Sequence, residues 1–142
     1  HLVRPIKQGF ENYLRDAKTD KVVIKGPAQG SGLPTIYAEA DVFCLPSIEE
    51  GFPLVNLQAL ASGCPVITTE AAGAADIIQD GINGLTIGNN SIEQLTEALE
   101  KLIDDAALRQ QISAAATARV QNGFSWDQYV SRAMSAYENL LN

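Results

Sequence analysis

Short apolar runs alternate along the chain with segments whose apolar residues recur at helical spacing. The strands predicted from β-branched and apolar runs are Val22–Lys25, Val42–Pro46, Pro65–Thr69 and Leu85–Ile87. The helices predicted between them are Leu33–Ala40, Pro53–Ser62 and Ala74–Gln79. Strands joined through helices are typical of a parallel sheet, so the pattern predicts a Rossmann-like α/β fold with helices on both faces.

After the last predicted strand the pattern becomes wholly helical. Ser91 with Gln94, and Ser125 with Gln128, have the spacing of capping boxes that open helices. Between them a second helix, from about residue 106 to 121, is expected to end at Gly123. The apolar residues that share one side of the last helix are Trp126, Tyr129, Val130, Ala133 and Tyr137. We expect the apolar sides of all three helices to pack in the core.

The predicted domain looks incomplete. About four parallel strands make half of a doubly wound sheet. In addition, Leu2–Arg15 has the pattern of a helix that should follow an earlier strand. Residues 1–142 are therefore expected to form one partial domain of a larger protein.

The distribution of charge says more than its total. The 142 residues carry a net charge of −7, but no Lys or Arg lies between Gly26 and Glu100. An acidic chain argues against nucleic acid as a partner, because that binding needs clustered cations. His1 is the single histidine, which excludes mechanisms that need an internal histidine and most zinc sites.

The cysteines and the hydropathy predict a cytoplasmic protein. Cys44 and Cys64 lie twenty residues apart without a Cys-x-x-Cys spacing, so we expect two reduced and mostly buried thiols. The sequence has no signal peptide and no apolar run of about 18 residues that would span a membrane.

Ligands of a doubly wound sheet bind outside the carboxyl ends of its strands. The loops in that position are Gly26–Gly32, Ser47–Phe52 and Glu70–Gly73. In the middle loop, Gly51 permits φ angles that other residues resist, and Pro53 suits the first turn of a helix. The free N–H groups of Leu54 and Val55 would then make that helix start an anion site.

Two polar side chains accompany this helix start. Glu50 stands just before it, and a carboxylate beside a phosphate would be repelled, so its natural partners are sugar hydroxyls. Gln58 lies one turn beyond Leu54 on the same helical face. Periodicity alone leaves open that Glu50 is a solvated loop acid and Gln58 a surface residue.

Seven short segments together carry a family resemblance. They are Val22–Gly26, Leu33–Phe43, Leu45–Ser47, Glu50–Phe52, Ala59–Ile67, Asp80–Leu85 and Phe124–Trp126. In these segments and their order the chain resembles the C-terminal domain of GT-B-fold glycosyltransferases of family 4, the group 1 retaining enzymes. The resemblance extends from about Lys21 to the end of the chain.

The resemblance implies a donor site around the middle loop. Glu50 matches a family glutamate that, with the backbone after it, holds the donor sugar and phosphates and acts in catalysis. The donor-binding residues implied beside it are Gly26, Pro27, Ala28, Ser47, Gly51, Phe52, Pro53, Leu54 and Gln58. Gly26, Pro27 and Ala28 would border the base and Ser47 would line the pocket. Gln58 departs from the family, because a second glutamate there binds the ribose.

The resemblance also implies what the parent protein does. Family enzymes transfer a glycosyl group from a nucleotide diphosphate sugar to a glycan, lipid or small molecule, without a metal ion or other cofactor. The cations that neutralise the diphosphate, an Arg and a Lys, would lie upstream of His1, and an N-terminal domain of the same parent would bind the acceptor. We therefore expect this fragment alone to be inactive. Peripheral membrane association is left open for the parent only.

Three other interpretations remain. Gln58 favours a non-catalytic nucleotide-binding module or a degenerate transferase, since an amide has lost the charge that strengthens hydrogen bonds to a ribose. Another GT-B relative, such as a sugar epimerase or phosphorylase, would need an internal histidine or a pyridoxal lysine. A lone flavodoxin-like domain would need strands that the sequence lacks.

Overall fold

The computed structural model describes residues 23, 26–28, 30–71, 73 and 77–141. The chain divides into two compact units, residues 1–35 and 36–142. The described part of the first unit contains one turn of 3-10 helix, η1 (Gly30–Gly32), and helix α2 (Leu33–Ala38) spans the point of division. The sheet and the remaining helices belong to the second unit.

Three parallel strands form the sheet of the second unit. In spatial order they are β1 (Phe43–Leu45), β2 (Val66–Thr69) and β3 (Leu85–Ile87). Cys44 of β1 and Leu85 of β3 both pair with Ile67 of β2. Because the strands are parallel, all three end at the same edge of the sheet, and the loops that follow them meet there.

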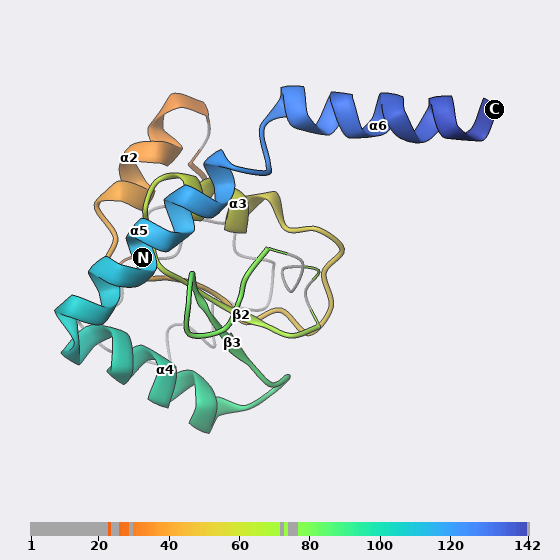
Figure 1. The fold of residues 1–142 in the computed structure, drawn as a ribbon. Coiled ribbons are helices and arrows are strands. Elements are labelled where there is room, and N and C mark those ends of the chain that lie inside the picture. The colour runs from red at the N-terminus through yellow and green to blue at the C-terminus, as the bar shows by residue number, and fades with distance from the viewer. Residues whose placement is uncertain (1–22, 24–25, 29, 72, 74–76, 142) are drawn as a thin grey trace. The chain divides into compact units, whose positions relative to one another are not determined.

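Helices cover both faces of this sheet (Figure 1). They are α3 (Leu54–Ala61), α4 (Ile92–Asp104) and α5 (Ala106–Gln121), and the chain ends in α6 (Trp126–Leu141). Successive side chains of a strand point to opposite faces. On β2, Thr68 meets Asn56 of α3, whereas Ile67 packs in one cluster with Leu102 of α4.

One cluster of the buried core joins the sheet to α4 and α5. Its buried members are Ile67, Leu85, Ile87, Ala98, Leu102 and Ile112. The predicted thiols are confirmed as free, with Cys64 buried and Cys44 partly buried. Cys44 packs against this cluster.

Side-chain caps begin the later helices as the sequence predicts. Ser91 Oγ accepts from the N–H of Gln94 at 3.2 Å at the start of α4, but the predicted box is only half formed there, because Oε1 of Gln94 accepts from the N–H of Gly88 at 2.6 Å. Before α6, Ser125 and Gln128 exchange two hydrogen bonds of 3.2 and 3.0 Å, a complete capping box. The bounds predicted for α5 are also confirmed.

Some predicted elements lie outside the described residues. These are the strand Val22–Lys25 apart from Val23, the helix Leu2–Arg15, and residues 74–76 of the helix predicted at Ala74–Gln79. Its described remainder, Ile77–Gln79, is not helical. The buried amide of Asn83 accepts from the N–H of Gln79 at 2.6 Å and donates to the carbonyl of Ile77 at 2.9 Å, so it satisfies these backbone groups in a turn.

The prediction of core packing is wrong for α6. None of its residues is buried, and the side chains of Trp126 and Tyr137 are 79% and 66% exposed. The periodicity correctly gave one apolar side, but nothing in the described chain covers it.

Within the described residues, no helix has both the length and the hydropathy needed to cross a bilayer.

Candidate functional site

The loop between β1 and α3, residues 46–53, is held at the carboxyl edge of the sheet by both neighbouring loops. We call it the edge loop. The carbonyl of Ser47 accepts a hydrogen bond from the hydroxyl of Thr69, at the end of β2. The carbonyl of Ile48 accepts another from Nδ2 of Asn89, just after β3, at 3.2 Å. Two segments remote in sequence thereby fix the start of the edge loop.

A third carbonyl of the edge loop is held by the loop that follows β2, and the two backbones approach closely there. The N–H of Gly73 donates to the carbonyl oxygen of Glu50 at 3.2 Å, and a Cβ on Gly73 would lie 1.9 Å from the carbonyl oxygen of Gly51. Only glycine fits at position 73. Gly51 has open space around it and no left-handed φ. The freedom of φ that the sequence gives Gly51 is therefore not used in the left-handed region, and the close approach requires glycine at position 73 instead.

Holding these carbonyls turns the following amides the other way. Across a trans peptide bond the C=O and the next N–H point in opposite directions, and no cis bond occurs among the described residues. The N–H groups of Ile48, Glu49 and Gly51 therefore point away from Thr69, Asn89 and Gly73. These three N–H groups are therefore turned away from the residues that hold the preceding carbonyls.

The edge loop leads directly into the start of α3. Pro53 is buried and occupies the N-cap position, with φ −74° and ψ 99°, one residue before the first helical turn in which the sequence predicts it. The N–H groups of Leu54 and Val55 precede the first intrahelical hydrogen bonds. This end of α3 therefore carries partial positive charge.

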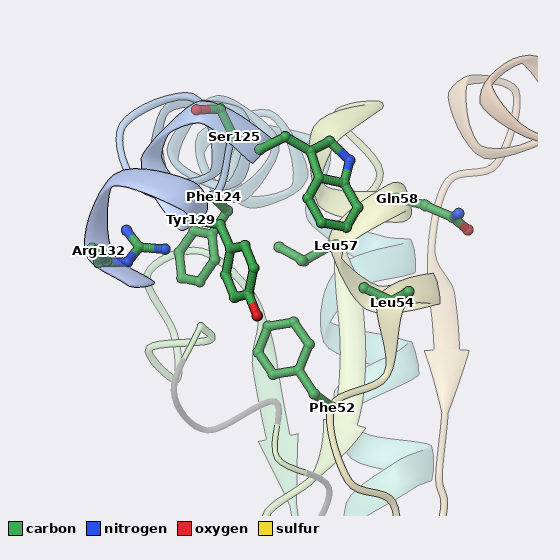
Figure 2. A pocket seen from close by; sticks show the side chains of 9 residues that line it. Phe52, Leu54, Leu57, Gln58, Phe124, Ser125, Tyr129 and Arg132 are labelled. Atoms are coloured by element: carbon green, nitrogen blue, oxygen red, sulfur yellow. The ribbon is translucent and has the colours of Figure 1, made fainter. Parts of the chain in front are cut away.

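An apolar pocket of about 670 Å³ lies between the start of α3 and α6 (Figure 2). Its lining residues are Phe52, Leu54, Leu57, Gln58, Phe124, Ser125, Trp126, Tyr129 and Arg132. On the α6 side, the rings of Trp126 and Tyr129 meet edge to face at 5.9 Å. Figure 2 shows the amide of Gln58 pointing away from Phe52 and Tyr129.

Comparison with known proteins decides the family. The family model of group 1 glycosyl transferases matches residues 7–119. The chain belongs to this family. A D-inositol 3-phosphate glycosyltransferase of Salinispora arenicola is 33% identical over 119 residues, which cover 84% of this chain and 26% of the relative. The chain thus spans about a quarter of the length of that relative.

Solved structures agree with the family. The C-terminal domain of a group 1 glycosyl transferase (LpcC) from Francisella tularensis is 32% identical, with a TM-score of 0.73 over 84% of this chain and 63% of that one. HepE from Anabaena, solved in complex with UDP and glucose, has the same fold at 22% identity. Its TM-score is 0.80, over 95% of this chain and 40% of that one.

In this group 1 glycosyltransferase domain the predicted site residues fall into two sets. Phe52, Leu54 and Gln58 line one pocket, and half-buried Glu50 lies in the adjoining edge loop. Gly26, Pro27 and Ala28 belong to the first unit. Their role at the base therefore stays a prediction.

Sequence reasoning missed several residues of the site. Thr69 and Asn89 hold the edge loop, yet each is an ordinary strand or loop residue until the sheet register is known. Gly73 lies in a loop that the sequence places at this edge, but its contact with the edge loop has no sequence signal. Arg132 brings a cation to the pocket wall, where its Nη1 donates to the carbonyl of Gly123 at 2.8 Å. The sequence signal for this wall was the segment Phe124–Trp126, part of the family resemblance.

Proposed function

We propose that the chain is the donor-binding part of a retaining glycosyltransferase. The parent would transfer a glycosyl group from a nucleoside diphosphate sugar to an acceptor held by its N-terminal domain. The observation that supports this best is the edge loop: its carbonyls at Ser47, Ile48 and Glu50 are held by hydrogen bonds from Thr69, Asn89 and Gly73, and the loop leads directly into the start of α3. The UDP and glucose bound to HepE support the class of ligand.

The roles proposed for the residues follow from their chemistry. The carboxylate of Glu50 accepts hydrogen bonds from sugar hydroxyls and repels phosphate. The phosphates would therefore lie against the amides of the edge loop and of Leu54. As the bond between sugar and diphosphate breaks, the sugar becomes oxocarbenium-like and negative charge grows on the diphosphate, which these amides stabilise.

The charge map limits what this chain does by itself. No Lys or Arg lies between Gly26 and Glu100, so this chain offers the single charge of Arg132, which lines the pocket, and about half a positive charge at the helix start. A leaving diphosphate carries about two negative charges. We propose that the chain binds a donor without turning it over, and that further cations come from the rest of the parent. We also propose that the parent acts in glycan biosynthesis in the cytoplasm without a metal ion, so that EDTA leaves transfer unchanged.

A pair of neighbouring carboxylates tests the role of Glu50. In the parent protein, Glu50→Gln keeps the shape but removes the charge, and we expect kcat to fall about 100-fold or more, the usual loss of one transition-state contact. Glu49→Gln changes an exposed carboxylate of the same loop and serves as the control. Glycosyl transfer by both variants is measured with UDP-, GDP- and ADP-glucose as donors, and Glu49→Gln should leave it unchanged. Equal activity of the two variants would refute the assignment.

A second candidate is a nucleotide-binding module that has lost catalysis. Gln58 favours it, because this exposed, neutral side chain stands where the family has a second glutamate. Calorimetric titration of UDP into the chain and its Gln58→Glu variant separates the two. A gain in affinity of tenfold or more would support a degenerate site, and an unchanged affinity would favour an amide that the working site uses.

A further inference from the structure

A chain of buried polar groups runs beneath the edge loop. Asn56, in the first turn of α3, is fully buried and donates from Nδ2 to Oγ1 of Thr68 at 3.3 Å. Thr68 in turn donates its hydroxyl proton to the carbonyl oxygen of Leu45 at 3.2 Å. Because the hydroxyl gives its proton to Leu45, its lone pairs face Asn56, which sets the orientation of the amide.

This orientation leaves one acceptor unsatisfied. Oδ1 of Asn56 is buried and has no hydrogen-bond partner among the described residues. Neighbouring positions on the same helix bury Ala59 and Leu60, so packing alone would favour an apolar residue at position 56. Buried polar groups without partners cost stability, so the presence of this amide indicates a role other than packing.

The two ends of this polar chain bracket the edge loop. Leu45 is the last residue of β1, immediately before the loop, and Asn56 lies just after it. Thr68 of β2 lies opposite Leu45 in the sheet register, and it bonds to both. A single hydroxyl therefore connects the residue that enters the loop with the helix turn that receives it.

We propose that Asn56 is a positioning residue for the donor site. Through Thr68 it fixes the distance between β1 and the start of α3, so that the intervening loop presents Glu50 and its amides in one conformation. That this conformation matters for donor binding rests on the proposed function. That Asn56 and Thr68 keep the loop ordered is a separate claim, which holds whether or not the loop binds a donor.

Isosteric replacements separate positioning from packing. Asn56→Leu combined with Thr68→Val removes both polar groups, including the orphaned Oδ1, and keeps the volume. We expect the double variant to unfold at a urea concentration equal to or above that of the unmodified chain. The backbone order parameters of Glu49, Gly51 and Leu54 should nevertheless fall from about 0.85 to below about 0.6, with Ala98 unchanged as the core reference.

The controls keep the two proposals distinct. Thr68→Ser retains the hydroxyl and should retain the loop order, and Thr68→Val alone tests the link if the double variant does not fold. UDP affinity, measured calorimetrically, should fall at least tenfold in the double variant. A double variant with a fully ordered loop would overturn the positioning role. Failure of the unmodified chain to bind UDP would instead count against the proposed donor, while the order parameters still decide the role of Asn56.

Discussion

Helices α5 and α6 have the same length and opposite surroundings. Each has 16 residues. In α5 the side chains of Ile112 and Ala116 are fully buried. α6 carries larger apolar side chains, Trp126 and Tyr129 among them, and buries none. Helical periodicity thus tells which side of a helix is apolar, but what covers that side depends on the rest of the protein.

Side-chain size explains part of the difference. Ser113 and Thr117 of α5 lie against Gly63, just after α3, where a Cβ would be 3.2 Å from Oγ of Ser113 and 3.6 Å from Oγ1 of Thr117. Small side chains let two helices approach closely and exclude water between them. The bulky aromatic side chains of α6 instead form one wall of an open pocket next to α3.

Truncating one buried and one exposed side chain tests this comparison most strongly. Ile112→Ala leaves a cavity in the core and should lower the free energy of unfolding by about 2–5 kcal/mol. Val130→Ala removes a side chain of α6 that is 53% exposed, and its effect should stay within about 0.5 kcal/mol. Urea unfolding curves measure the free energy of unfolding of both variants, and we expect the dependence of that free energy on urea concentration to match that of the unmodified chain. A comparable loss from Val130→Ala would mean that α6 is covered in solution.

A pair of glycines extends the test to the edge loop. Gly73→Ala places a methyl group against the carbonyl of Gly51 and should cost about 1–3 kcal/mol of stability, as overpacking does. Gly51→Ala adds the same methyl group to the other partner of this contact, where the space is open. Its unfolding midpoint should stay close to that of the unmodified chain. Equal losses would show that the loops do not pack as closely as the structure indicates.

Local features of this chain were predictable, and contacts across the sheet were not. The bounds of α5 and the capping box of Ser125 and Gln128 depend on residues a few positions apart, and both are confirmed. The partners of the edge loop depend on the strand register. Asn89 reaches Ile48 over 41 positions, and no local pattern distinguishes it from any other turn residue.

The candidate site divides in the same way. Glu50, Leu54 and Gln58 follow one another along a loop and the helix after it, so their sequence spacing was enough to group them, and the family resemblance added Phe52. Gly51 was singled out for its backbone freedom, yet the glycine that the packing requires is Gly73. Glycine in a loop signals special geometry, but only the structure tells which loop approaches which.

Two chemical probes report on the covered and the exposed regions with the smallest perturbation. On the covered side, burial raises the pKa of the thiols of Cys44 and Cys64 from 9.0 to about 11. At pH 8 the thiolate fraction should then be about a hundredfold lower than for an ordinary thiol, and alkylation by iodoacetamide slower to the same degree.

On the exposed side, the fluorescence of Trp126, the single tryptophan, should be quenched by acrylamide as fully as that of a free indole.

The pH dependence gives the thiol prediction a sign. A raised pKa means that the folded chain holds these protons more tightly than the unfolded chain, which releases them near pH 9. The stability contributed by the thiols is therefore complete below pH 9 and is lost as the pH rises toward 11. Unfolding midpoints measured across that window should fall with pH, and Cys44→Ala with Cys64→Ala should remove part of the slope. A slope that the double variant leaves unchanged would show that the two thiols are not covered in the folded chain.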